Sequence, residues 1–271
     1  MVFVRTCPEV WSCSSGQRPR RRGDCHYIFS FLVSRGRPIR DGPGGKSKTV
    51  LINQDRRGRS FFVVMYRETR NYLNIQKALY TGEGEFGIPK IPKADPVNVE
   101  DWLGFNYVRG CEDPELHGVH FFLDDYQFNR IWDRADDYTR RLAQFRAVIS
   151  PDFSMYTDFP KAVQIFNCYR NHWLGRYWAE HGVNVVPCVM WSDHESYTYC
   201  FDGDPIGSAV AVSSVGTQVD GMTKELFLDG YAEMLRRLDP VQILFYGSIP
   251  EEIEDRSKIV QLEAYAAKWR E

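Results

Sequence analysis

The chain has 271 residues, of which 43% are hydrophobic and 26% are charged, and its formal net charge is −2. These values are ordinary for a globular protein of one large or two small domains, and they exclude a wholly disordered chain. No apolar run approaches the roughly 20 residues that span a bilayer. The N-terminus also lacks the apolar core of a secretory signal. The sequence therefore predicts a cytoplasmic protein with no membrane partner.

Charge divides the chain into two unlike parts. Residues 1–60 contain 13 Lys or Arg and 4 Asp or Glu, whereas the remainder contains 21 and 32. The basic part is rich in Gly, Pro, Ser and Arg, which predicts a low-order segment. Three interpretations stay open: an arm attracted to nucleic-acid phosphates, an inert tail, or a start-site error with Met65 as the true start. Residues 61–118 are predicted to be a lead-in segment that wraps the main domain, residues 119–271.

Seven cysteines are spread along the chain without a Cys-Xaa-Xaa-Cys pair. Their odd count and wide spacing indicate reduced thiols, as in a cytoplasmic protein. Cys7, Cys13, Cys25 and His26 offer zinc ligands, but their spacing matches no common zinc finger.

Apolar runs recur at intervals through the main domain. Most are continuously apolar rather than alternating, which is typical of parallel strands buried on both faces. Five runs and a weaker sixth occupy residues 119–126, 147–154, 183–191, 209–216, 243–249 and 258–265. Helical patterns separate them, so the sequence predicts an α/β fold of repeated βα units with a mainly parallel sheet. An open doubly wound sheet and an incomplete barrel both satisfy this pattern.

Several helix ends are also predicted from capping residues. The helix after the second run is expected to stop at Gly182. The helix after the fourth run is expected to begin with Thr223 as its N-cap. Ser248 and Glu251 have the spacing of a capping box, which predicts a helix after the fifth run.

Carboxylates follow three successive predicted strands. Asp124, Asp152 and Asp193 stand at the carboxyl ends of the first three runs, where sites form in both architectures. Together they are candidates to hold a divalent metal or to activate water. His194, next to Asp193, is the candidate general acid–base, whereas His120 is expected to be a core histidine. The alternative is that these aspartates only cap the helices that follow.

The helix after residue 160 carries a polar stripe beside its apolar one. Gln164, Asn167 and Asn171 recur at helical spacing, and such amides are able to read a base edge or a polar ligand. Arg170 is a candidate for binding a phosphate or carboxylate. The alternatives are a solvated face and a contact with a neighbouring helix.

Five stretches resemble a known family: "HFFLDDYQFNRIW", "ISPDFSMYTDFPKAVQIFNCYRNHWLG", "GVNVVPCVMWSD", "SYTYCFDGDP" and "ILFYGS". The chain is similar, over about residues 100–263, to an uncharacterised bacterial and phage family known as domain of unknown function number 4417. The resemblance implies no established activity. Its association with phages and mobile elements favours nucleic acid as a partner. The pattern it implies comprises Asp124, Asp125, Asp152, Ser154, Gln164, Asn167, Arg170, Asn171 and Trp191.

The leading functional hypothesis is a metal-assisted enzyme that acts on a phosphate-containing substrate such as nucleic acid. Asp124, Asp152 and Asp193 would bind the metal. Asp125, Ser154, Trp191, Arg170 and the amides of the helix would position the substrate. The alternative is a non-catalytic module that binds a host protein or nucleic acid. The net charge of −11 outside residues 1–60 argues against broad phosphate binding by the main domain.

Overall fold

The computed structural model describes residues 48–54, 60–66 and 73–262. The chain divides into two compact units, Met1–Tyr66 and Arg67–Glu271. In the first unit, β1 (Lys48–Gln54) and β2 (Ser60–Tyr66) form an antiparallel pair, with Lys48 opposite Tyr66 and Gln54 opposite Ser60.

The strand β1 lies inside the segment predicted to have little order. The run "TVLI" concentrates β-branched residues that the average composition of the segment hides, and such residues favour strands. Residues 1–47 and 55–59, including the candidate zinc ligands, lie outside the described residues. The arm, tail and start-site interpretations therefore stay predictions, and Met65 is a residue of β2.

Seven parallel strands form the centre of the second unit, within residues 73–262. They are β5 (Trp102–Gly104), β6 (Gly118–His120), β7 (Ala147–Ile149), β8 (Val185–Val186), β9 (Ala209–Ser213), β10 (Gln242–Tyr246) and β11 (Ile259–Leu262). All six predicted runs contain a strand, so the parallel α/β fold is confirmed. The strand β5 was not predicted, because only three residues of the Gly- and Pro-rich lead-in pair with β6.

The strands follow one another in chain order. One sheet has the order β5-β6-β7-β8 and the other β9-β10-β11, and a parallel bridge between Cys188 and Ala211 joins them. A doubly wound sheet needs a reversal of strand order, and the described residues show none. The sheet also curves, because the rings of His120 and Phe122, at the end of β6, lie 4.9 and 4.7 Å from that of Tyr246 on β10. The arrangement is therefore that of an incomplete barrel.

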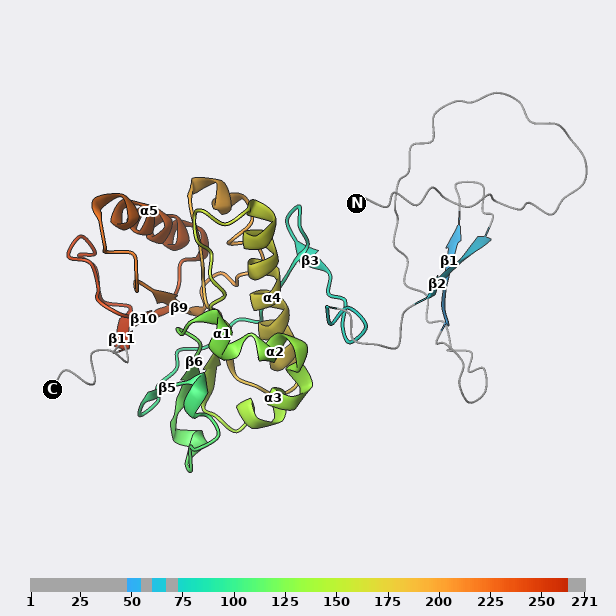
Figure 1. Cartoon of the computed structure of the whole chain (residues 1–271), viewed down its shortest axis with the longest axis horizontal. Coiled ribbons are helices and arrows are strands. Elements are labelled where there is room, and N and C mark those ends of the chain that lie inside the picture. The colour runs from blue at the N-terminus through green and yellow to red at the C-terminus, as the bar shows by residue number, and fades with distance from the viewer. Residues whose placement is uncertain (1–47, 55–59, 67–72, 263–271) are drawn as a thin grey trace, which may run out of the picture. The chain divides into compact units, whose positions relative to one another are not determined.

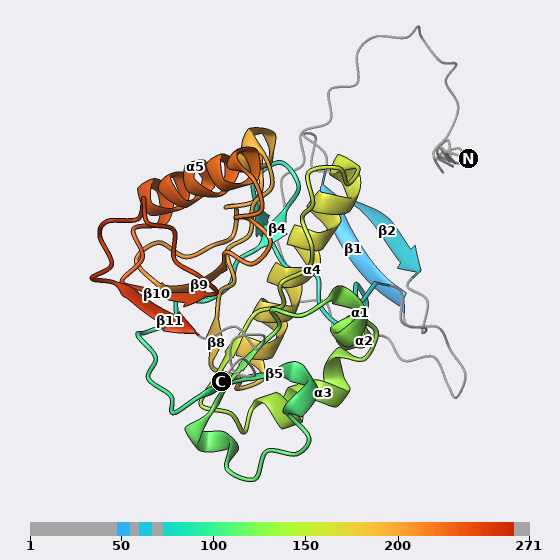
Figure 2. The ribbon, with the colours of Figure 1, turned by 60° about the vertical axis from the view of Figure 1, so that its left-hand side comes forward.

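Helices follow the strands around the sheet in the same order, as Figures 1 and 2 show. The helical elements are α1 (Asp125–Phe128), α2 (Arg130–Asp133), α3 (Ala135–Leu142), α4 (Lys161–Glu180), the 3-10 helix η3 (His194–Thr198) and α5 (Gly221–Leu238). The stop at Gly182 is confirmed, since this glycine has φ +87° just after α4.

Two predicted helix starts are wrong. The N-cap of α5 is Asp220 rather than Thr223, which is the third helical residue and completes a capping box with Asp220. No helix follows β10 in the described residues. There Ser248 accepts hydrogen bonds at its carbonyl from Ser214 and Gln218, and Pro250 begins a turn, so the chain passes directly to β11.

From Arg67 onward the lead-in belongs to the same compact unit as the barrel, whereas residues 61–66 belong to the first unit. After β3 (Gly82–Glu83) and β4 (Ile88–Pro89), residues 91–99, here called the base strap, cross the amino ends of β9 and β10. The backbone N–H of Ala94 donates to the Ser208 hydroxyl, and the Ala94 carbonyl accepts from the backbone N–H of Ala209. The side chain of Gln242 both donates to and accepts from the backbone of Val97. The strap is thus fixed by polar contacts to strands more than a hundred residues away.

Apolar packing holds the helices on the barrel. Val119 of β6, Val148 of β7 and Phe121, which directly follows β6, share a buried cluster with Trp173 and Trp178 of α4. The same cluster also takes in residues of α1–α3. A second cluster joins the rest of the sheet, the base strap and α5. The lead-in contributes three buried residues and one half-buried residue to this packing: Ile88, Ile91 and Phe105, then Trp102. The 3-10 helices η1 (Phe105–Tyr107) and η2 (Pro114–Leu116) lie between β5 and β6.

Among the described residues, no helix is long and apolar enough to cross a membrane.

Candidate functional site

Four polar residues from three elements form a closed network at the carboxyl ends of β6 and β7. The backbone N–H and hydroxyl of Ser154 donate to Asp125 Oδ1, at 3.1 and 2.8 Å. Asn167 Nδ2 donates to the Ser154 carbonyl at 2.6 Å, and Arg170 Nε donates to Asn167 Oδ1 at 3.0 Å. Arg170 Nη2 lies 3.5 Å from Asp125 Oδ2, which closes the network. We call Asp125, Ser154, Asn167 and Arg170 the polar network.

The local structure explains why these four meet. Asp125 is the first residue of α1, directly after β6, and Ser154 lies in the loop after β7. Asn167 and Arg170 are one turn apart on α4, so their side chains share a face. Because β6 and β7 are neighbours in the sheet, their carboxyl ends bring the loop and the helix together.

Arg170 is a buried cation held on several sides. Its side chain is only 14% exposed, its Cζ lies 3.7 Å from the centre of the Phe153 ring, and its Nη1 donates to Asn129. Burial lowers the pKa of Arg170 to about 10, while the charges of Asp125 and Asp133 act in the opposite direction. The guanidinium remains charged at neutral pH and fixes the position of the Asp125 carboxylate.

Asp152 lies beside this network, in the same loop as Ser154. The residue as a whole is half-buried, while its carboxyl group is densely surrounded by protein atoms. Cys188 Sγ donates to Asp152 Oδ1 across 3.8 Å. Burial raises the pKa of Asp152 to about 7, and the charge of Asp125 adds to the rise. Burial also raises the pKa of the Cys188 thiol, so the cysteine acts as a proton donor here rather than as a thiolate.

The three aspartates expected to bind a metal do not come together. Asp124 is exposed at the N-cap position of α1, and Asp193 caps η3 by accepting from Ser196 N–H. Within the described residues, the group of three whose ligand atoms lie within 4.8 Å of one another is instead Cys111, Asp113 and His117. Each carboxylate has a different partner: Asp124 accepts from Gln127 of α1, Asp193 from Ser196 of η3, and Asp152 from Cys188. A shared metal site of the three stays a prediction.

The predicted acid–base histidine is also separate from Asp152. His194 is 65% exposed, and its Nε2 pairs with Asp229 of α5 at 3.2 Å. His120, expected in the core, is buried between β6 and β10, as its ring contact with Tyr246 shows.

The remaining predicted ligand residues have structural partners. Gln164 donates to the carbonyls of Tyr156 and Phe159 and accepts from the Tyr199 hydroxyl. Asn171 donates to the Cys188 carbonyl. The amide stripe of α4 thus faces the barrel and fixes its loops, whereas the apolar Phe166 of the same helix is exposed.

Trp191 has a packing role. Its ring lies 5.4 Å from that of Phe227, and its Nε1 would be 2.2 Å from a Cβ added at Gly230. The close approach of this indole to α5 depends on the absence of a side chain at Gly230.

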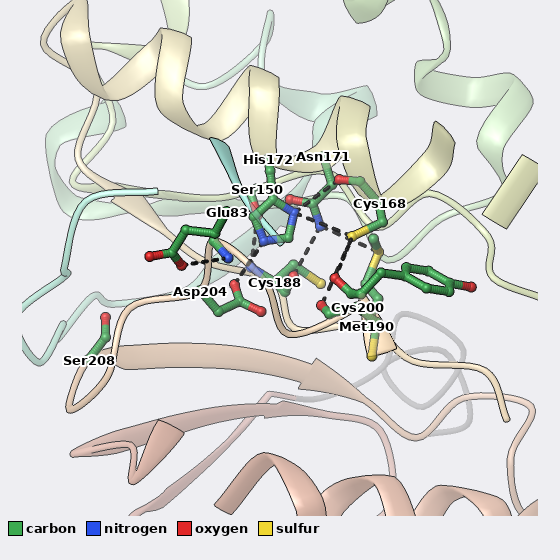
Figure 3. A network of polar contacts seen from close by, with 12 residues as sticks. Glu83, Ser150, Cys168, Asn171, His172, Cys188, Met190, Cys200, Asp204 and Ser208 are labelled. Carbon is green, nitrogen blue, oxygen red and sulfur yellow. Dashed lines mark hydrogen bonds and ion pairs between the residues drawn. The ribbon is translucent and has the colours of Figure 1, made fainter. Parts of the chain in front are cut away.

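A buried ion pair between α4 and the loop before β9 is absent from the residues predicted from the sequence. His172 Nε2 lies 3.2 Å from Asp204 Oδ1, and the two side chains are 1% and 0% exposed. His172 Nδ1 contacts the Cys168 carbonyl at 2.9 Å, as Figure 3 shows. Burial alone lowers the pKa of His172, but the Asp204 carboxylate outweighs it and raises that pKa well above its ordinary value. The sequence offers no signal for this pair, since the partners are 32 residues apart.

Comparisons with known proteins identify a family and two similar phage proteins. The family model described as Domain of unknown function (DUF4417) matches residues 80–265. The chain belongs to this family. It is 41% identical over 151 residues to the "Gene 1 protein" of Mycobacterium phage L5, and 34% identical over 176 residues to the "Gene 1 protein" of Mycobacterium phage D29. These matches cover 56% and 64% of the chain, and 65% and 63% of the relatives. The chain thus spans just under two thirds of either relative. No solved structure matches it.

Proposed function

We propose that this member of the DUF4417 family is an enzyme that moves a proton on a phosphate-containing substrate, with nucleic acid as the expected substrate class. Asp152 is the proposed general acid or base. The observation that carries the proposal is the position of Asp152, closely surrounded at the carboxyl end of β7 and next to a second, fixed carboxylate.

Unequal environments of two neighbouring carboxyl groups are typical of acid–base sites. Asp125 accepts two hydrogen bonds from Ser154 and lies beside Arg170, so its charge is stabilised. Asp152 lacks such a cation, and its only described hydrogen-bond donor is the weak donor Cys188. A carboxyl group with a pKa of about 7 is present in both protonation states at neutral pH, which general acid–base catalysis requires.

The choice of substrate class rests on the relatives and on the fold. Both named relatives are phage proteins, which by association favours a substrate of nucleic-acid chemistry. Sites of barrels built from βα units lie at the carboxyl ends of the strands, where Asp125 and Asp152 are found. The thiols Cys111, Cys168, Cys188 and Cys200 are unpaired, which supports a reducing, cytoplasmic location.

The test uses the full chain and labelled single- and double-stranded DNA and RNA, with manganese or with a chelator. Products are separated on denaturing gels, and complexes on native gels. We expect product formation that falls by about 100-fold or more in Asp152→Asn. The matched control is Asp158→Asn, which changes an exposed carboxylate in the same loop. Equal activity of the two variants would contradict a catalytic role for Asp152.

A second function is favoured by the polar network itself. Its four side chains satisfy one another, and Arg170 has little exposed surface left for a ligand. This arrangement suits a rigid, non-catalytic module that binds a host protein or nucleic acid. A complex on native gels without any product on denaturing gels would favour this module over the enzyme.

A further inference from the structure

A cavity of about 220 Å³ lies on the helices outside the barrel, away from Asp152. Four arginines and one carboxylate line it, namely Arg109, Arg130, Arg134, Arg141 and Asp137, together with the rings of Phe105 and Tyr138. It shares no lining residue with the polar network or with Asp152. The cavity is therefore a separate feature of η1, α2 and α3 and of the loop after η1.

The positive charge of this cavity is largely uncompensated. Arg134 pairs with Asp137 at 2.6 Å. Arg109, Arg130 and Arg141 have no ion pair with a carboxylate among the described residues, and the side chain of Arg109 has no hydrogen-bond partner there either. Most of the chain outside residues 1–60 is acidic, with a net charge of −11, so this concentration of guanidinium groups is a local exception.

Two of the arginines are held in the cavity wall by hydrogen bonds to other protein groups. Arg141 donates to the carbonyls of Val108, Arg109 and Cys111, which fixes the backbone that carries Arg109. Arg130 donates through Nε to the Tyr138 hydroxyl and lies 4.9 Å from the centre of the Phe105 ring. The Tyr138 oxygen accepts that bond, so its own proton is left to donate elsewhere. The terminal nitrogens of Arg109 and Arg134 remain as donors.

We propose that this cavity binds a phosphate group, carried by a nucleotide or by an oligonucleotide. Guanidinium groups donate paired hydrogen bonds that match phosphate oxygens, and three uncompensated cations suit a group of one or two negative charges. Arg109 and Arg134 are the proposed direct contacts, Arg130 supplies charge from the cavity wall, and Arg141 positions Arg109. The site is independent of the proposed acid–base chemistry.

The test measures binding to the full chain by calorimetry with inorganic phosphate and with a mononucleotide, and by fluorescence anisotropy with a labelled single-stranded oligonucleotide. The test variant is the double substitution Arg109→Gln with Arg134→Gln. The control is Arg140→Gln, which removes an exposed arginine of the neighbouring helix α3 that does not line the cavity. Melting temperatures confirm that each variant is folded.

We expect the double variant to weaken binding by about 10-fold or more, and Arg140→Gln to weaken it by less than about 3-fold. Binding of phosphate and mononucleotide identifies a small ligand, whereas binding of the oligonucleotide alone, with a steep loss at higher salt, identifies a nucleic-acid backbone. Either result supports the proposal if the double variant is the weak one. It is overturned if the wild-type chain binds none of these ligands, or if the two arginine changes in the cavity have no more effect than Arg140→Gln. Asp152→Asn should bind phosphate like the wild type, which separates this result from the proposed enzyme activity.

Discussion

Ser154 donates two hydrogen bonds to a single oxygen of Asp125, one from its backbone N–H at 3.1 Å and one from its hydroxyl at 2.8 Å. The pair joins the start of α1 to the loop after β7, and thus the ends of two neighbouring strands. It also holds a negative charge close to Asp152, where that charge contributes to the raised pKa of Asp152.

Removing the charge of Asp125 should therefore change the titration of Asp152. In Asp125→Asn we expect the pKa of Asp152 to fall from about 7 by up to about one unit, because burial, its largest cause, remains. Carboxyl carbon shifts followed by NMR across pH 4 to 9 measure this directly. Asp124→Asn removes the neighbouring exposed carboxylate and should leave the titration unchanged. A similar shift in both variants would show that Asp125 has no special influence.

Asp152 should lower the stability of the folded chain at neutral and higher pH. Its pKa is about 7 in the folded protein, against an ordinary value of 3.8, so the folded state binds more protons between these values. Stability from this group is then lost as pH rises from about 4 to 7. We expect Asp152→Asn to gain about 1–3 kcal/mol relative to wild type between pH 4 and pH 8, after allowance for the partial exposure of the carboxyl.

Urea unfolding at a series of pH values measures that difference. Asp158→Asn, in the same loop but exposed, should differ from wild type by a constant amount across the range. A gain in stability combined with a loss of activity in Asp152→Asn would indicate that the carboxyl is kept for function. A flat difference for Asp152→Asn would mean that its environment does not penalise the charge.

Two His–Asp pairs with the same 3.2 Å separation should behave differently because only one is buried. Asp204→Asn removes the partner of the buried His172, and we expect a loss of about 3–5 kcal/mol in the free energy of unfolding. The pKa of His172 should fall below 6.5, because burial then acts without a carboxylate. Asp229→Asn, beside the exposed His194, should cost less than about 1 kcal/mol.

Histidine ring proton shifts and urea unfolding give the two readouts. The raised pKa of His172 also fixes the sign of its pH dependence. Its stabilising effect is complete below pH 6.5 and is lost as pH rises through the folded-state pKa. Similar losses in both variants would show that burial does not distinguish the pairs.

Gly230 should resist substitution because of Trp191. A Cβ at Gly230 would lie 2.2 Å from the indole nitrogen, so Gly230→Ala must displace the ring or α5. We expect a loss of about 1–3 kcal/mol despite the better helix propensity of alanine, together with a change in tryptophan fluorescence. Gly221→Ala, at the start of the same helix with open space around it, should be neutral or slightly stabilising. A stable Gly230→Ala protein with unchanged fluorescence would contradict this packing.

Sequence reasoning found the strands because their signal is local. The run "ILF" of β10 is continuously apolar and has no polar residue to place on a solvated face, so burial on both sides follows from composition alone. Strand order depends on contacts between distant segments, and the sequence left the barrel and the doubly wound sheet equally open. The stacking of Phe122 on Tyr246 is one such distant contact.

The candidate site was harder to predict because a single residue decides which carboxylate points inward. Asp124 and Asp125 are adjacent, yet Asp124 precedes the first turn of α1 while Asp125 belongs to it and reaches Ser154. Pattern alone favoured Asp124, and only the resemblance to the family implied Asp125. For Asp193, the sequence left metal binding and helix capping open, and its contact with Ser196 is the capping one.

The sequential strand order has a consequence for the order of events during synthesis. Neighbouring strands are also consecutive in the chain, so most of the sheet is able to assemble as each βα unit leaves the ribosome. The base strap is different, because its partners are synthesised much later. Ser208 follows Ala94 by 114 residues, and Gln242 follows Val97 by 145 residues. The strands β6 and β7, which precede Asp125 and Asp152, are therefore complete well before the opposite end of the barrel is closed.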